Sequence, residues 1–162
     1  MGHPRYRLAR AHKVTTRSAG NLTLNSTNWA NVDTGLDITL AAQAGDVLEA
    51  SLSAVVDANA VILYLDVVTV VSAAPVNSFG KKGAVTAAPL PAGVSSWYCA
   101  ASVLTMVGAP IHYTAVAGDL ASGLVTLRLR YATATATNRI LNADSNVPVE
   151  FCVKNLGPAD GT

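Results

Sequence analysis

Hydrophobic and polar residues alternate along most of the chain with a period of two. Leu48, Ala50 and Leu52 alternate with polar residues, and the same pattern returns further along the chain. Successive side chains of a strand point to opposite faces, so this alternation predicts strands with one buried face. A helical period of 3.6 is not sustained anywhere, which favours an all-β chain. The segments that predict strands on this pattern are 22–24, 36–40, 48–52, 111–115, 125–131 and 147–153.

One further segment, residues 61–71, is apolar on both faces and rich in β-branched residues. Its composition and its flanking turn residues favour a long central strand over a helix. Asp66 is the single charge within it, and a buried carboxylate must be paired or hydrogen-bonded. We expect its partner to be Arg128 or Arg130, from the same chain or from a neighbouring copy. For these two arginines we favour acidic partners on a neighbouring copy.

Turn residues mark the connections between these strands. Segments 42–46 and 115–119 share the pattern Ala-x-Ala-Gly-Asp, and each precedes an alternating run. Glycine supplies a positive φ and aspartate bonds its own backbone, so both segments are predicted to be structural corners. One carboxylate per corner is too few for a calcium site. Residues 75–98, with Lys81 and Lys82 near the centre, are predicted to form one long loop of the kind that carries function or interfaces.

Composition places the chain among folded single domains. It has 162 residues, of which 51% are hydrophobic and 13% charged, against a usual charged share of about 25%. This balance excludes disorder. Either both faces of several strands are buried, or other copies of the chain cover part of the surface, and we favour the second interpretation. The chain has no apolar segment of about 20 residues that could span a membrane. The basic N-terminus is not followed by the apolar stretch of a signal peptide, so we expect synthesis in the cytosol and no membrane partner.

Charge is distributed unevenly, although the net charge is only +1. The first 17 residues hold five bases and no acid, whereas the rest holds six bases and ten acids. We therefore divide the chain into a basic arm (1–17), a β-sandwich (18–157) and a C-terminal tail (158–162). The arm is either a solvated terminus or a segment that orders on an acidic partner. Five charges with one aromatic residue make a weak case for nucleic acid, which we do not expect as a partner. Partner binding is assigned to Arg5, Tyr6, Arg7, Arg10, Lys13 and Arg17.

Candidate catalytic chemistry is sparse. The sequence has no phosphate-binding glycine loop, nucleophile elbow or metal-ligand spacing, so we predict neither an enzyme nor a cofactor. Cys99 and Cys152 are predicted to be two reduced, packed thiols, with a disulfide as the alternative. His112 lies in an alternating strand and is predicted to face outward or into an interface. Trp97 and Tyr98 are either core filler or an exposed pair that binds sugars.

Several short sequence segments in the predicted strands and corners also resemble segments of a known group of proteins. They are Asn28 to Val32, Leu36 to Leu40, Ala44 to Glu49, Leu65 to Val70, Asn77 to Gly80, Ala117 to Leu120, Gly123 to Tyr131 and Pro148 to Asn155. In these segments the chain resembles small virion structural proteins of tailed bacteriophages of actinobacteria. The resemblance covers residues 18–157, and the basic arm lies outside it.

This resemblance implies a fold and an assembly. Such proteins are similar in plan to the heads of tumour necrosis factor and complement C1q, which are jelly-roll trimers. We therefore expect a single-domain antiparallel jelly-roll β-sandwich of about eight strands with an extended N-terminal arm. In a homotrimer the segment 61–71 would lie at or near the three-fold axis. The residues expected at the trimer interface are Ile62, Tyr64, Asp66, Val68, Arg128 and Arg130.

The resemblance also implies a function. The first hypothesis is a capsid decoration (minor capsid) protein that binds the outer capsid shell as a trimer. The basic arm would then contact acidic surface of the major capsid protein. The alternative is a tail or fibre module that binds a host-surface receptor or glycan through Trp97 and Tyr98. A hydrolase and a tail-tube subunit in rings of six are less favoured, and both a head and a tail location stay open.

Overall fold

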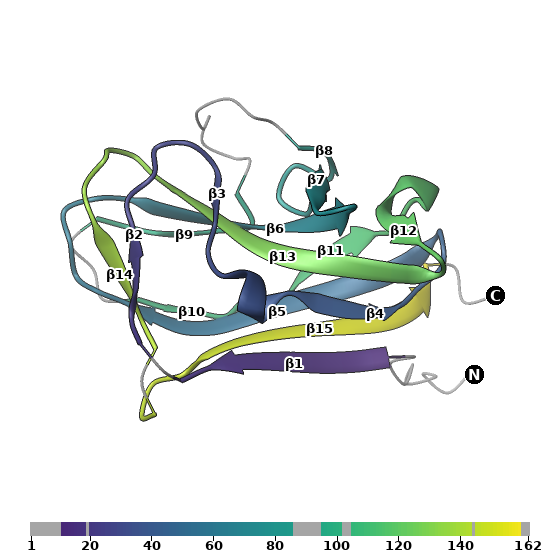
Figure 1. Cartoon of the computed structure of the whole chain (residues 1–162), viewed down its shortest axis with the longest axis horizontal. Helices are drawn as coiled ribbons and strands as arrows, with labels where there is room; N and C mark the ends of the chain where they lie inside the picture. Colours follow the sequence, from purple (N-terminus) through teal and green to yellow (C-terminus); the bar gives the residue numbers. More distant parts are fainter. Residues whose placement is uncertain (1–10, 19, 86–94, 102–104, 144, 160–162) are drawn as a thin grey trace, which may run out of the picture.

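The computed structural model describes residues 11–18, 20–85, 95–101, 105–143 and 145–159. Within this part, two antiparallel sheets pack face to face as a sandwich (Figure 1). The regular helical structure described is limited to two short 3-10 turns, η1 (Thr34–Leu36) and η2 (Ala117–Asp119). No helix in these ranges has the length and apolar character needed to cross a bilayer.

The first sheet consists of β1 (Ala11–Arg17), β2 (Leu22–Leu24), β5 (Asp46–Val56), β10 (Thr105–Val107), β11 (Ile111–Thr114), β14 (Arg139–Asn142) and β15 (Val149–Pro158). β5 is central and pairs with β15 and β14 on one side and with β11 and β10 on the other. β1 pairs with β15, and β2 pairs with β14. β11 therefore lies at one edge of this sheet.

The second sheet consists of β3 (Ala30–Asn31), β4 (Ile38–Ala41), β6 (Leu63–Val71), β7 (Ala74–Ser78), β8 (Gly83–Ala84), β9 (Trp97–Cys99), β12 (Leu120–Ala121) and β13 (Leu124–Thr133). β13 pairs with β6 along its length, and on its other side with β4 and β3. β6 pairs in turn with β9 and β7, and β7 with β8. The β7–β8 hairpin therefore lies at the edge of the second sheet.

Several short strands follow one another along the same neighbouring strands and count as one strand of the sandwich: β1 with β2, β3 with β4, β7 with β9, β10 with β11, and β14 with β15. Together with β5, β6 and β13, and leaving aside the two-residue strands β8 and β12, they make eight strands. Numbered in chain order, these lie side by side as 1-8-3-6 in the first sheet and as 2-7-4-5 in the second. This arrangement is that of a jelly roll, which is built from two Greek keys. The prediction of an all-β, antiparallel jelly-roll sandwich of about eight strands is confirmed.

The core lies between the two sheets and follows the alternation of the sequence. Along β5, buried and half-buried residues alternate from end to end, with Leu48 and Leu52 at most 1% exposed. Val125, Leu127 and Leu129 fill the same layer from β13. Each buried side chain of this size contributes about 1.5–3 kcal/mol by leaving water. This apolar layer is the main stabilising feature of the sandwich.

The two predicted corners share an aspartate-to-backbone hydrogen bond and contact each other, but the positive φ predicted for both glycines is found at Gly45 and not at Gly118. Asp46 and Asp119 each accept a hydrogen bond from the backbone N–H three residues earlier, at 2.9 and 2.8 Å. Gly45 has a φ of +92°, the left-handed region where glycine is favoured. Its N–H donates to the carbonyl oxygen of Ala115 (2.8 Å), and the Ala115 N–H donates to that of Asp46 (2.9 Å). The corners thus join the two sheets at one end of the sandwich, which confirms their structural role.

The boundaries of the sandwich differ from those predicted. Residues 11–17 were assigned to a free arm, but they form β1, which pairs with residues 149–155 of β15. β15 itself continues to Pro158. The segment 75–98 is not one irregular loop, because it contributes to β7, β8 and β9, while its residues 86–94 lie outside the described ranges. Strand β1 was not predicted from the sequence. Charged residues, Lys13 and Arg17, occupy two positions on its face toward the second sheet, and such charges are typical of a solvated segment.

Candidate functional site

Two of the six residues assigned to the basic arm lie in the described part of the chain, and both hold β1 in place. The Lys13 ammonium donates to the carbonyl oxygen of Thr39 (3.1 Å). Arg17 forms an ion pair with Asp33 (2.6 Å) beside η1. These contacts tie the edge of the first sheet to the second sheet, so the two charges stabilise the sandwich itself. The other four, Arg5, Tyr6, Arg7 and Arg10, lie outside the described residues.

Asp66 is fully buried, and its charge is compensated within the chain. Arg130 donates to its carboxylate through Nη2 (2.8 Å) and Nε (3.1 Å). The hydroxyls of Ser78 (2.6 Å) and Ser96 (2.7 Å) and the backbone N–H of Gly80 (3.1 Å) add three more donors. Five donors offset the large desolvation cost of a buried carboxylate. The predicted pairing of Asp66 with an arginine is confirmed, and the partner belongs to the same chain.

The expectation that Arg128 and Arg130 pair with acids of a neighbouring copy is wrong. Arg128 binds both carboxylate oxygens of Asp37, with the shortest contact at 2.6 Å. Arg130 lies between Asp66 and the ring of Trp29, with its guanidinium carbon 4.3 Å from a ring centroid. The outer face of β13 and β6 is covered here by the chain's own loops. These contacts could not be read from the sequence because Asp37 and Trp29 lie about a hundred residues away from β13.

The remaining interface candidates differ in exposure. Val68 is 0% exposed within a single chain, so it needs no neighbouring copy to cover it. Ile62 and Tyr64, in contrast, are half-buried. A trimer axis along this face would therefore have to use Ile62 and Tyr64 rather than the buried residues around Val68. The homotrimer itself stays a prediction.

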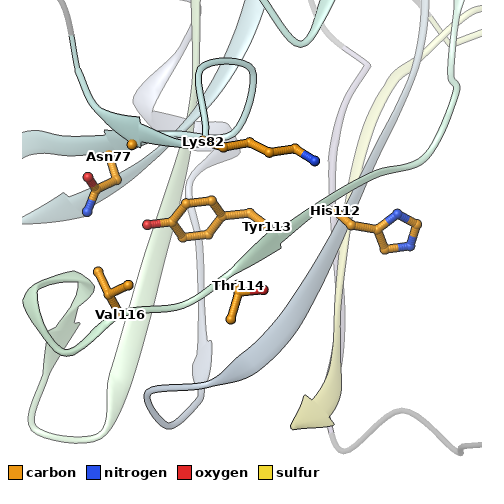
Figure 2. A pocket seen from close by; sticks show the side chains of 7 residues that line it. Asn77, Lys82, His112, Tyr113, Thr114 and Val116 are labelled. Carbon is orange, nitrogen blue, oxygen red and sulfur yellow. The ribbon is translucent and has the colours of Figure 1, made fainter. Parts of the chain in front are cut away.

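A cleft opens at the edge where β11 of the first sheet faces the β7–β8 hairpin of the second (Figure 2). Its volume is about 320 Å³, and Tyr113 lies at its centre with the hydroxyl on the Asn77 side. A second hollow of about 330 Å³ continues along β11 and shares Lys82 and His112 with the first. The cleft is lined by Asn77, Lys82, His112, Tyr113, Thr114 and Val116, among others.

Below this cleft, the buried carboxylate of Asp119 fixes the floor. It accepts hydrogen bonds from Thr69 Oγ1 (2.6 Å), Asn77 Nδ2 (2.7 Å), the Tyr113 hydroxyl (2.9 Å) and the Val116 N–H (2.8 Å). Burial, together with the hydrogen bond to Asp119, raises the pKa of the Tyr113 hydroxyl well above its usual value, so Tyr113 remains a donor. The polar groups of the floor are therefore held in fixed positions.

A row of titratable side chains crosses the outer face of the first sheet. The strand registers align His12, Lys154, Glu49 and His112 across four strands. Glu49 binds the Lys154 ammonium at 2.9 Å and His112 Nε2 at 3.1 Å. The hydrogen bond from Lys154, with a further one from His112, lowers the pKa of Glu49 despite partial burial. His112 faces outward with 52% of its side chain exposed, as predicted, and its carboxylate partner lies 63 residues away.

The two cysteines are free thiols on different sheets, which confirms the prediction. Cys99 on β9 is fully buried, and burial raises its pKa. Cys152 lies half-buried on β15, where its Sγ is 3.1 Å from Nε2 of His12. Among the described residues, no group of three or more histidine, cysteine or acidic side chains could hold a metal ion.

The aromatic pair assigned to possible sugar binding is split between core and surface. Trp97 is 8% exposed, and its indole N–H donates to the carbonyl oxygen of Ala109 (2.7 Å). Tyr98 is 66% exposed on the opposite side of the strand. Successive strand residues face opposite ways, so the pair does not form one joint aromatic platform. The cleft beside His112 was not predicted from the sequence, although Lys81 and Lys82 were predicted to lie near the centre of a functional or interface-forming segment.

No family model matches the chain, and no curated protein matches it either. Among solved structures, the chain is similar to one of infectious bursal disease virus, strain Gx, with 9% identity and a TM-score of 0.40 over 94% of this chain and 38% of that one. A mutant VP2 protein of this virus, from derived T=1 particles, gives 8% identity and a TM-score of 0.40 over 97% and 40%. A VP2 subviral particle of the virus gives 10% identity and a TM-score of 0.36 over 92% and 38%. The chain thus spans about two fifths of the length of these proteins, and likenesses at this level carry no functional inference.

Proposed function

We propose that the chain is a structural component of a virus particle and, more specifically, a capsid decoration protein of a tailed bacteriophage. The observation that carries this proposal is the strand order of the two sheets, which is that of a jelly roll. Viral capsid proteins are among the proteins built on this fold. Further support comes from the segments within residues 28–49 and 117–131, which resemble segments of phage virion proteins.

In this proposal the sandwich forms a trimer on the outer shell, and the segment before β1 contacts the major capsid protein. Lys13 and Arg17 hold β1 in place, and the remaining bases of the arm, Arg5, Arg7 and Arg10, would contact acidic capsid surface. The half-buried Ile62 and Tyr64 supply apolar contact between copies. Each decorated site adds buried area across neighbouring capsid subunits, which opposes the outward pressure of packaged DNA.

A tail or fibre module that binds a host receptor is the second candidate. The exposed Tyr98 favours it, because a large aromatic side chain that is 66% exposed is typical of a contact surface. Binding of the isolated protein to host cells that Tyr98→Ser abolishes, together with no binding to phage heads, would promote this candidate over decoration.

The decoration proposal is tested by co-sedimentation of the purified protein with expanded heads of the encoding phage. The full chain is compared with a variant lacking residues 2–10, which retains all of β1, and with a variant in which Arg5, Arg7 and Arg10 are serine. We expect the full chain to pellet with heads at a fixed ratio and both variants to stay in the supernatant while remaining folded. Full-chain protein that never pellets with heads contradicts the proposal, and truncated protein that still pellets contradicts the role of the arm.

A further inference from the structure

Two lysines stand out in the charge pattern of the described residues. In those ranges every other lysine and arginine side chain bonds to an acid or to a carbonyl oxygen. The acid pairs are Arg17–Asp33, Arg128–Asp37, Arg130–Asp66, Arg139–Asp57 and Lys154–Glu49, while Lys13 binds the Thr39 carbonyl. The ammonium groups of Lys81 and Lys82 have no such partner in this part of the chain. Uncompensated positive charge is thus concentrated on the β7–β8 turn.

The turn holds Lys82 in a strained backbone conformation. Its φ is +55°, a left-handed value that is unfavourable for a residue with a Cβ. The turn is fixed from below, because the Gly80 N–H donates to the buried Asp66 carboxylate (3.1 Å) and the Lys81 N–H to the Ser78 hydroxyl (3.1 Å). Strained residues that are fixed by their surroundings concentrate at ligand sites. Figure 2 shows the Lys82 side chain extending along the cleft toward the His112 side.

The rest of the cleft offers neutral polar groups and an apolar wall. Asn77 uses its Nδ2 group on Asp119, which leaves its Oδ1 as an acceptor. Thr114 presents a hydroxyl from an exposed position on β11. Val116, 48% exposed, lines the end of the cleft. Among the described residues, no acidic side chain lines the cleft. Asp119 lies beneath its floor and accepts four hydrogen bonds, and Glu49, behind His112, is bonded to His112 and Lys154.

We propose that this cleft binds a sugar acid, with the carboxylate on the Lys82 ammonium. Hydroxyl groups of the sugar would donate to Asn77 Oδ1 and bond with the Thr114 hydroxyl, and its apolar face would pack on Val116. A volume of about 320 Å³ is at the small end for ligand clefts and suits one sugar unit. The combination of one cationic group, neutral polar groups and an apolar wall distinguishes a sugar acid from a bare anion. This binding site does not depend on the virion role.

The test is a titration of the ¹⁵N-labelled full chain, followed by NMR, with sodium D-glucuronate, D-glucose and sodium sulfate in parallel. We expect glucuronate to shift the amide signals of Asn77, Lys82 and Thr114 in a saturable way. Glucose and sulfate should each bind at least about tenfold more weakly, because each lacks half of the required contacts. Equal affinity for glucose or for sulfate would overturn the proposal, and so would the absence of saturable shifts with glucuronate.

Variants separate the role of Lys82 from that of general charge. Lys82→Gly removes the ammonium group and also accepts the positive φ, so the variant should fold at least as well as the parent. Lys82→Asn tolerates the same conformation and serves as the second variant. We expect both to weaken glucuronate binding about tenfold. The matched control, Lys81→Gln, removes the same charge one residue away and should change affinity less than about twofold. Unchanged affinity in both Lys82 variants, or an equal loss in the control, refutes the assignment.

Discussion

Replacing Asp66 alone should destabilise the protein more than replacing Asp66 and Arg130 together. In Asp66→Ala the Arg130 guanidinium, 4% exposed, loses its carboxylate, and the hydroxyls of Ser78 and Ser96 lose their acceptor. Removing one partner of a buried ion pair costs about 3–5 kcal/mol. For a chain of this length, a loss of 1 kcal/mol lowers Tm by about 2–4 °C, so a decrease of about 10 °C is expected.

The double variant Asp66→Leu with Arg130→Met replaces both charges by apolar side chains. Such replacements are often neutral or stabilising, but the Ser78 and Ser96 hydroxyls and the Gly80 N–H still lose their acceptor, so its Tm should lie between those of Asp66→Ala and the parent. Urea unfolding of the parent, Asp66→Leu, Arg130→Met and the double variant completes the cycle. The single-variant loss must be independent of protein concentration, because the pair lies within one chain. A loss that changes with concentration, or a double variant as unstable as Asp66→Ala, would refute the reasoning.

Three further predictions concern other parts of the structure. The pKa of Glu49 is lowered below its ordinary 4.5, so its stabilising effect is present above that pH and is lost as the pH falls through the lowered value. Glu49→Gln should therefore lower the urea midpoint at pH 7 and have little effect on it near pH 3. Equal effects on the midpoint at both pH values would contradict this. Deleting residues 2–10 should preserve cooperative thermal unfolding, whereas deleting 2–17 removes β1 and should abolish it; circular dichroism compares the two. Cys152 should react with a maleimide in the native protein and Cys99 only after unfolding, as mass spectrometry of the labelled peptides would show, and rapid native labelling of Cys99 would contradict its burial.

Local patterns were enough to predict the long strands β5, β6, β13 and β15 and the positions of the two corners, but not β1. The alternation of apolar and polar residues along β5 identifies the core face directly, since buried and half-buried residues follow a period of two. The Gly45 corner was predictable because its backbone conformation favours glycine. The outer face of the second sheet was not predictable in the same way. Its charged residues are buried by segments distant in sequence, and nothing local indicates that Arg130 stacks on Trp29.

The edge cleft shows a similar limit of local reasoning. Lys82 was visible in the sequence as part of a functional segment, but its neighbour His112 comes from another sheet. The pairing of His112 with Glu49 depends on the register of β11 against β5. Only the three-dimensional arrangement shows that the two bases share one hollow with Asn77. Pairings across a sheet edge need strand order and register, which the periodicity of a single segment does not contain.

The most direct test of the proposed function is the position of this protein in the intact particle, determined by cryo-electron microscopy of the encoding phage. We expect trimers at local three-fold sites on the outer capsid shell, where each jelly roll fits the density of the map. The segment before β1 should extend onto the major capsid protein. Density for this protein on the tail, or its absence from the particle, would contradict the assignment as a decoration protein.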